Sequence, residues 1–476
     1  MQHTDLYIDG QWREAASGDR FDVINPATEE TIASVASADL ADADAALDAA
    51  QAAFGLWAAK KPRERSEILR KAWELMTARL DEFAQLITLE NGKARADAMG
   101  EAAYAAEFFR WFAEEAVRAD GMITHAPSSG ARIVVQHKPA GIAVLVTPWN
   151  YPAAMGTRKI APALAAGCPV IIKPASETPL TMLALMPLLE EAGVPKGLVN
   201  VLPSKKSGRL VDHMLHDPRV RVISFTGSTE VGRKLLHSAA DQVLKPAMEL
   251  GGNAPLIVFE DADIDKAVTG AMLAKMRNLG EACTAANRFY VHEAVSQEFT
   301  SKFCAAMAAL TMGNGMEDGI DVGPLVNADT RDKVAAFVAD AVAKGARLEL
   351  GGILPNGKGY YYPPTVLSNV PETADCVNDE IFGPVAAIQS FTDEDDVIRR
   401  ANNTEYGLVA YVFSENMKRA MQVCERLEYG MVGLNRGLVS DPAAPFGGVK
   451  QSGLGREGGH EGMLEFMETQ YISAEW

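Results

Sequence analysis

Cys283 is the side chain in this sequence whose setting best suits a nucleophile. It lies in the segment 278–288 (NLGEACTAANR), which has the composition of a loop. The other four cysteines lie in apolar or helical segments, where a free cysteine is usually a small buried hydrophobe. A cysteine nucleophile needs a base or a local electric field to form its thiolate. Since no histidine lies nearby in the sequence, a protease-like Cys–His pair has no support.

Glu249 is the candidate base that remains. It lies in MELGGN (248–253), at the end of a strand-like run, and a carboxylate at such a place is able to accept a proton. The alternative interpretation is a surface glutamate, which the surrounding apolar residues and glycines weaken. The sequence therefore offers a thiol nucleophile and a carboxylate base.

Two strand ends are candidates for binding a nucleotide. In FTGSTEVG (225–232) a strand gives way to a helix, where backbone N–H groups near Gly227 and the Ser228 hydroxyl are free to meet a pyrophosphate. Ordinary helix capping by serine is the alternative. Lys173 ends another apolar strand, with Ser176 three residues later, and this pair suits an adenosine ribose beyond a parallel sheet. A solvated lysine before a helix is the competing interpretation.

The elements that must position these residues follow an α/β pattern. Residues 39–120 have helical periodicity, and from residue 142 short apolar strands alternate with helices of 10–15 residues, which predicts a parallel sheet. A second α/β series runs from about 253 to 435. Two such lobes predict a cleft between them. The only GxGxxG string, 453–458, lacks the surrounding βαβ unit and is interpreted as a glycine-rich turn.

Composition and charge exclude several classes of protein. With 476 residues, 48% of them hydrophobic, the chain is able to bury a large core in two or three domains. A formal charge of −18 argues against nucleic acid as the main partner. The polar N-terminus predicts no signal or transit peptide, and no apolar run approaches the ~20 residues of a membrane helix. Five scattered cysteines predict a reducing, cytoplasmic location, and no metal site is expected.

Seven motifs in order resemble those of the aldehyde dehydrogenase superfamily, and the similarity runs over essentially the whole chain. Within the superfamily, the chain is most similar to succinate-semialdehyde dehydrogenases. The segments that carry this closer resemblance are AMGTRKIAPALAAG, MRNLGEACTAANR and APFGGVKQSGLGREG. The seven motifs are TPWNYP (147–152), KPAS (173–176), FTGSTEVGR (225–233), MELGGNAP (248–255), EACTAANR (281–288), EIFGP (380–384) and PFGGVKQSG (445–453).

The resemblance implies a reaction through a cysteine thioester. Cys283 attacks the aldehyde carbon, and the Asn150 amide with the Cys283 backbone N–H stabilises the thiohemiacetal oxyanion. Hydride transfer to a nicotinamide leaves a thioester, and Glu249 activates the water that hydrolyses it. Lys159 and Glu457 match the positions of a proton relay that serves Glu249.

The resemblance also implies the cofactor and substrate contacts. NAD or NADP is the expected cofactor; strict NAD enzymes of the family often carry a glutamate where Ser176 stands, so NADP is expected to be accepted and preferred. The neighbouring Glu177 leaves this open, because its side chain is able to turn toward the ribose. Arg158, Arg277 and Ser440 match contacts to the carboxylate of a semialdehyde, and either arginine could instead pair with a structural carboxylate. Phe446 would wall the tunnel, while Arg436, where relatives often carry a small polar residue, could shorten it or add charge. The expected cofactor contacts are Thr147, Pro148, Trp149, Lys173, Pro174, Ala175, Ser176, Gly227, Ser228, Leu250, Glu380 and Phe382.

The implied fold is a Rossmann-like cofactor domain (1–120 and 140–250), an α/β catalytic domain (251–458) and a small β oligomerisation element (121–139 and 459–476). The segment Arg132–His137 is expected to be an edge strand that pairs with another subunit of a homodimer or homotetramer. Three alternatives stay open: an aldehyde dehydrogenase of broader specificity, an enzyme that passes its acyl group to coenzyme A, and a catalytically silent binding protein. Glu249 argues against the second, and the presence of Cys283, Glu249 and Asn150 against the third.

Overall fold

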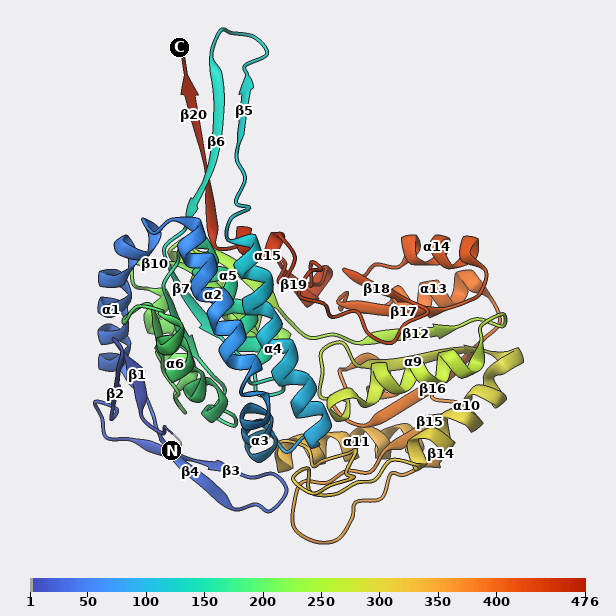
Figure 1. Cartoon of the computed structure of the whole chain (residues 1–476). Coiled ribbons are helices and arrows are strands. Elements are labelled where there is room, and N and C mark those ends of the chain that lie inside the picture. Colours follow the sequence, from blue (N-terminus) through green and yellow to red (C-terminus); the bar gives the residue numbers. More distant parts are fainter. Residues whose placement is uncertain (1–2) are drawn as a thin grey trace.

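The computed structural model describes residues 3–476, and within them two large mixed sheets stand beside each other (Figure 1). The first sheet is built mainly from parallel strands, with antiparallel strands at its two ends. Its order is β19 (Gly453–Leu454), β11 (Lys245–Glu249), β10 (Val220–Thr226), β7 (Ile142–Val146), β8 (Val170–Lys173), β9 (Val199–Val201), β1 (Leu6–Ile8) and β2 (Gln11–Arg13).

Both faces of the first sheet are covered by helices, which explains why its central strands are apolar throughout. In β7 the side chains of Ala143 and Leu145 enter the core on one face, and those of Ile142, Val144 and Val146 enter the core on the other. Helices on the first face are α2 (Pro62–Thr77), α3 (Leu80–Asn91), α4 (Arg95–Glu115), α5 (Ala154–Ala166) and α6 (Leu180–Ala192); those on the second are α1 (Leu40–Ala58), α7 (Ser207–Leu215) and α8 (Thr229–Asp241).

The second sheet is also parallel apart from one edge strand. Its order is β14 (Arg347–Leu350), β15 (Thr365–Ser368), β16 (Val385–Phe391), β13 (Ala286–His292), β12 (Ala254–Val258), β17 (Val409–Phe413) and β18 (Met431–Leu434). Its helices are α9 (Ile264–Met276), α10 (Glu293–Ala308), α11 (Ala328–Ala343), α12 (Asp375–Asn378), α13 (Glu394–Asn402) and α14 (Met417–Arg426). The predicted α/β class is confirmed.

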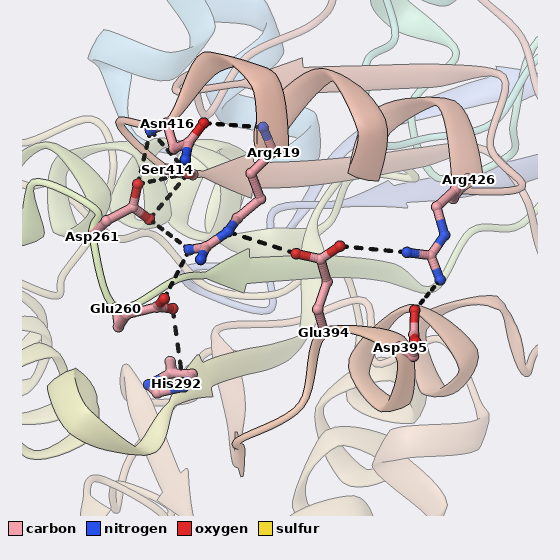
Figure 2. Close-up of polar contacts among 9 residues, drawn as sticks. All are labelled: Glu260, Asp261, His292, Glu394, Asp395, Ser414, Asn416, Arg419 and Arg426. Carbon is pink, nitrogen blue, oxygen red and sulfur yellow. Dashed lines mark hydrogen bonds and ion pairs between the residues drawn. The ribbon is translucent and has the colours of Figure 1, made fainter.

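The carboxyl edge of the first sheet faces the amino-end loops of the second. Thr226 at the end of β10 and Leu250 just after β11 line the same cavity as Cys283 and Phe382, which precede strands of the second sheet. The opposite, carboxyl edge of the second sheet is closed by a network of ion pairs around Arg419 (Figure 2). The cavity therefore lies between the carboxyl edge of the first sheet and the amino edge of the second.

A three-stranded sheet projects from the body as an arm (Figure 1). It consists of β5 (Met122–His125), β6 (Arg132–Pro139) and β20 (Met467–Ala474), and β20 follows the short helix α15 (Glu461–Leu464). The expectation that Arg132–His137 is an edge strand without a partner in its own chain is wrong. β6 is the middle strand, since it pairs with β5 just before it in the sequence and with the C-terminal β20.

The smaller elements complete the chain. β3 (Arg20–Ile24) and β4 (Thr31–Ala36) form a separate hairpin, and 3-10 turns occur at Arg277–Gly280 and Lys450–Ser452. The GxGxxG string begins in the two-residue strand β19, which pairs antiparallel with β11 and places Gly453 opposite Glu249, so this string does not open the parallel βαβ unit of a dinucleotide fingerprint. Among the described helices there is none whose length and apolar character would let it cross a membrane. The three domain boundaries stay a prediction.

Candidate active site

The loop that carries Cys283 is fixed by hydrogen bonds from Asn278. This residue lies in the 3-10 turn before the loop with a φ of 54°. Its backbone N–H donates to Asp97 Oδ2 at 2.9 Å, and its Nδ2 donates to the backbone carbonyls of Asn150 and Glu281 at 3.0 and 2.9 Å. Asn278 thus links the loop of Cys283 to the loop of Asn150.

Asn150 is buried between β7 and α5, with its amide close to the loop of Cys283. Its Nδ2 donates to the carbonyl of Glu281 at 3.0 Å, and its Oδ1 has no partner among the described residues. Within residues 3–476 the backbone N–H of Cys283 makes no hydrogen bond either. One amide hydrogen of Asn150 and the N–H of Cys283 are therefore available as donors for an oxyanion.

A cavity of about 270 Å³ collects many of the predicted site residues around Cys283. It is lined by residues from both sheets, as the facing edges require. The predicted residues in its wall are Pro148, Trp149, Asn150, Arg158, Gly227, Ser228, Leu250, Arg277, Cys283, Glu380, Phe382, Ser440 and Phe446. The predicted residues that are not part of this wall are Thr147, Lys159, Lys173, Pro174, Ala175, Ser176, Glu249 and Glu457.

Cys283 is held as the neutral thiol in this cavity. Burial raises the pKa of Cys283 to about 12, and the carboxylates of Glu380 and Glu249 act in the same direction. Arg158 and Arg277 oppose the shift. Because the thiolate is the nucleophile, the proton has to leave as the sulfur attacks, and a nearby base is needed to accept it.

Glu249 ends β11 and is 3% exposed. Burial raises the pKa of Glu249 well above its usual range, and the neighbouring Glu457 adds to the shift. Its Oε2 has no hydrogen-bond partner in the described part of the chain. A Cβ on Gly447 would lie 2.9 Å from Glu249 Oε1, so the glycine leaves room for the carboxylate. A buried carboxylate with a raised pKa suits a general base that works near neutral pH.

Lys159 and Glu457 lie together beside Glu249. The Nζ of Lys159 pairs with Glu457 Oε1 and donates to Ser224 Oγ at 2.8 Å, and this lysine is fully buried. The other carboxylate oxygen of Glu457 lies 2.7 Å from the Nε of Arg158. This last contact is an ion pair without the alignment of a hydrogen bond. Glu457 is thus bracketed by two successive cations of α5.

Aromatic and acidic groups in the wall of the cavity fit a nicotinamide nucleotide. The rings of Trp149 and Phe382 meet edge to face, with their centres 5.3 Å apart. Glu380 accepts a hydrogen bond from the Gly252 N–H at 3.3 Å, and burial raises the pKa of Glu380 to about 7. Thr226 Oγ1 is buried and has no partner among the described residues. These groups offer a ring platform and unused polar atoms.

The predicted ribose and phosphate contacts lie at neighbouring strand ends. Ser228 caps α8, accepting from the Val231 N–H at 3.4 Å. Lys173 ends β8 and is 6% exposed; burial lowers the pKa of Lys173 to about 8. Within residues 3–476 the ammonium of Lys173 makes no hydrogen bond or ion pair, while Ser176 Oγ donates to Glu177 Oε2 at 3.1 Å. An unpaired buried cation at this place suits an anionic ligand group.

Two arginines line the cavity, and they differ in whether a carboxylate pairs with them. Arg158 shares its charge with Glu457, and its Nη2 has no partner among the described residues. Arg277 forms no ion pair with a carboxylate in the described chain; its Nη2 donates to Thr284 Oγ1 at 3.3 Å. The alternative of pairing with a structural carboxylate therefore applies in part to Arg158 and not to Arg277.

Tyr104 is a cavity residue that the sequence analysis missed. It lies on α4, and its hydroxyl is buried near Ser440 without a hydrogen-bond partner in the described residues. The sequence of α4 shows only helical periodicity, which gives no sign that one residue reaches the cavity. Arg436, by contrast, lies outside this cavity; it is exposed and lines an adjoining hollow that shares Ser440 and Phe446 with it.

Comparisons with known proteins agree with this arrangement. The model of the aldehyde dehydrogenase family matches residues 12–472. A succinate-semialdehyde dehydrogenase of Paenarthrobacter nicotinovorans is 55% identical over 93% of this chain and 98% of its own length, and a glutarate-semialdehyde dehydrogenase of Pseudomonas putida is 46% identical over 98% and 96%. The crystal structure of an NADP-dependent enzyme of E. coli superposes with a TM-score of 0.98 at 44% identity, covering all of this chain and 98% of that one. The chain belongs to the aldehyde dehydrogenase family.

Proposed function

We propose that the protein oxidises a short aldehyde bearing a terminal carboxylate, with succinate semialdehyde as the preferred substrate, to the corresponding acid. The observation that carries the proposal is the pair of arginines in the wall of the cavity that holds Cys283. Arg277 has no carboxylate partner in residues 3–476, and Arg158 keeps one nitrogen unpaired. Arg158 is buried and Arg277 is half-buried, and withdrawing a cation with unused donors from solvent is costly, so a substrate carboxylate would lower that cost.

The residues of the chain supply each acid–base and binding step. Cys283 sulfur adds to the aldehyde carbon as its thiol proton passes to Glu249 and on to the pair of Lys159 and Glu457, and Asn150 Nδ2 with the Cys283 N–H binds the resulting oxyanion. NADP or NAD, when bound, supplies the hydride acceptor that turns this adduct into a thioester. Glu249 then takes a proton from water as the water attacks the thioester carbon, and Lys159 with Glu457 carries that proton away. The carbon–sulfur bond breaks and Cys283 is restored.

Cofactor binding is proposed at the edge of the first sheet. Glu380, Phe382 and Trp149 would hold the nicotinamide and its ribose, and Ser228 at the start of α8 would meet the pyrophosphate. Lys173 and Ser176 would face the adenosine ribose. Because Lys173 is buried and unpaired in the described chain and position 176 has no carboxylate, both cofactors are expected to bind, with NADP preferred. The remaining contacts of this proposal are Thr147, Pro148, Pro174, Ala175, Gly227 and Leu250.

The arm supports a homodimer or homotetramer. All four residues of β5 are exposed, and Ile123 and Tyr471 on the arm are 70% and 59% exposed. Both β20 and β18 lie at sheet edges, where unpaired backbone groups favour pairing with another chain. Sedimentation of the wild-type protein should give a mass of two or four chains, and a monomer at micromolar concentration would reject this. A cytoplasmic location remains proposed, in keeping with five free cysteines.

Steady-state kinetics with matched aldehydes tests the substrate. We expect kcat/KM for succinate semialdehyde to exceed that for butanal, which has the same carbon chain without the charge. In Arg277→Ala the semialdehyde should lose about 10–150-fold in kcat/KM, the size of one charge-assisted hydrogen bond, while butanal changes little. Glutarate semialdehyde, one carbon longer, tests the length of the cavity. Equal losses for both aldehydes would show that Arg277 is structural.

A further inference from the structure

Arg158 lies between the inner cavity and the relay carboxylate. The guanidinium carbon is 4.3 Å from the ring centre of Phe446 and 5.2 Å from that of Phe108, so the cation lies over two aromatic rings. Its Nε lies 2.7 Å from Glu457 Oε2, whereas its Nη2 is buried and has no partner among the described residues. The Nε edge of the cation is thus occupied, Nη1 donates to Met155 Sδ at 3.9 Å, and Nη2 is the nitrogen left free.

Glu457 is coupled to the cavity by its backbone as well as by its charge. Its N–H and C=O exchange two hydrogen bonds of 2.8 Å with those of Phe446, which lines the cavity. Its carboxylate is divided between Lys159 and Arg158. Any ligand that attracts Arg158 toward the cavity must therefore weaken one of the two ion pairs that hold Glu457.

We propose that Arg158 is a shared cation: its Nε side holds Glu457 in the relay with Lys159, while its Nη side binds the substrate carboxylate. A bound carboxylate then competes with Glu457 for the same charge. Binding of an anionic acyl group at one end of the cavity thereby alters proton transfer at the other. This inference rests on the proposed function, because it takes the substrate to be an anionic aldehyde. Arg158 acts here both as a substrate contact and as a positioning residue for Glu457.

The expected consequence is a change in the pH dependence of thioester hydrolysis. The base Glu249 must be ionised, and drawing positive charge away from its surroundings raises its pKa further. As the pH is lowered, the rate of thioester hydrolysis should therefore begin to fall at a higher pH for an anionic acyl enzyme than for a neutral one. The charged or titratable groups around Glu249 and Glu457, which set this balance, are Arg158, Lys159, Arg456, Cys283, Tyr104 and Glu465.

Direct measurement of thioester decay isolates this step. An excess of enzyme with NADP is acylated by succinate semialdehyde or by butanal. The reaction is quenched in acid at increasing times, and the mass of the intact protein is measured by mass spectrometry. The decay of the succinyl or butyryl mass gives the hydrolysis rate at each pH, whichever step limits turnover. The acid limb is the part of the pH–rate profile in which the hydrolysis rate falls as the pH is lowered. In the wild type the acid limb of the succinyl enzyme should lie about 0.5–1 pH unit above that of the butyryl enzyme. Identical limbs would overturn the proposal without recourse to any variant.

Two substitutions of Arg158 separate its roles. In Arg158→Gln the acid limb of the butyryl enzyme should move to higher pH, because Glu457 loses a cation. The acid limb of the succinyl enzyme should coincide with it, because no shared cation remains. Arg158→Lys keeps a charge for Glu457 but has one ammonium in place of a two-edged guanidinium. It should restore the butyryl limb while kcat/KM for the semialdehyde stays low. Arg70→Gln, at an exposed ion pair on α2, is the matched control for the loss of an arginine.

The possible results distinguish the two proposals. If succinate semialdehyde does not acylate the enzyme, the proposed function fails, and the butyryl enzyme still shows whether Arg158 acts on Glu457. If the semialdehyde is preferred but the two limbs coincide in the wild type, the proposed function stands and the sharing of Arg158 is wrong. A difference between the limbs that persists in Arg158→Gln would also overturn the inference, since the coupling would then run through another group.

Discussion

Lys93 and Glu101 form a fully buried ion pair, with 2.6 Å between Nζ and Oε2, under the loop that carries Asn150. The same ammonium donates to the backbone carbonyl of Asn150 at 2.7 Å and lies 4.3 Å from the ring centre of Tyr151. Glu101 Oε1 accepts the backbone N–H of Ala153 at 2.8 Å, just before α5. The pair therefore connects α4 to the backbone of the proposed oxyanion donor.

Loss of one partner of this pair should destabilise the protein strongly. In Lys93→Met the carboxylate of Glu101 is left buried without its cation, which should cost about 3–5 kcal/mol of unfolding free energy. Lys302→Met removes a lysine from an exposed pair on α10 and should cost about 0–1 kcal/mol. Urea denaturation of both variants measures the difference. Equal costs would show that the buried pair contributes no more than a surface pair.

Three substitutions test the proposed chemistry by the phase of the reaction that they block. Cys283→Ala should abolish aldehyde oxidation and leave cofactor binding near the wild-type value. Glu249→Gln should still give a single burst of reduced cofactor, slowed because the Cys283 thiol then loses its proton to solvent, and should stop at the thioester because no base activates water. Asn150→Ala should lower kcat by about 10²–10³, the usual loss for one oxyanion donor. Stopped-flow absorbance at 340 nm follows all three. Steady turnover by Glu249→Gln would remove it as the base for hydrolysis.

The buried thiol gives a pH prediction of its own. Since the pKa of Cys283 is raised to about 12 by burial, the thiolate is a minor species at neutral pH and its population rises tenfold for each pH unit. Alkylation of the enzyme without cofactor or aldehyde by iodoacetamide should therefore accelerate log-linearly from pH 7 to pH 10. Mass mapping of the Cys283 peptide separates this site from Cys304 and Cys424, which are also partly exposed. A plateau below pH 9 would mean that the free enzyme already stabilises the thiolate.

Local signals in the sequence indicated part of the site, and the family resemblance implied the rest. Lys173 and Glu249 were recognised as polar residues that end apolar strands, and the structure places them at the ends of β8 and β11. The alternation of strands and helices predicted the α/β class because burial on both faces leaves a continuous apolar run. These signals each lie within a few residues of sequence, which is why they are readable without a structure.

Contacts between distant segments were not predictable in the same way. Lys159 and Glu457 are separated by 298 residues, and their pairing was implied by the family resemblance rather than by any pattern. The sequence leaves open that Arg158 pairs with a structural carboxylate, but no local pattern identifies Glu457 as that carboxylate. The family resemblance places 121–139 and 459–476 in one element, but it does not show that β6 pairs with β20 of the same chain, because strand periodicity indicates which face is buried and not which strand lies alongside.

Arg436 should act on substrate entry rather than on chemistry. It is exposed and makes no ion pair within residues 3–476, and its hollow adjoins the cavity at Ser440 and Phe446. In a protein of net charge −18, a cation at this position attracts an anionic aldehyde. Arg436→Ser should lower kcat/KM for the semialdehyde by about 2–5-fold at low ionic strength, with kcat unchanged. The effect should fade in 0.5 M salt, and a loss that is independent of salt would contradict steering.

Glu177 should limit the preference for NADP. Its carboxylate accepts a hydrogen bond from Ser176 Oγ at 3.1 Å, beside the unpaired ammonium of Lys173, so a negative charge is held near the proposed place of the 2′-phosphate. In Glu177→Gln this repulsion disappears, and kcat/KM with NADP should rise by about 3–10-fold while that with NAD stays nearly constant. Lys173→Met should act in the opposite sense, because the phosphate loses its cation. The ratio of kcat/KM for the two cofactors, measured with one saturating aldehyde, is the deciding quantity, and Ser176→Ala controls for loss of the hydrogen bond alone. An unchanged ratio in both Glu177→Gln and Lys173→Met would mean that the 2′-phosphate is not bound at this strand end.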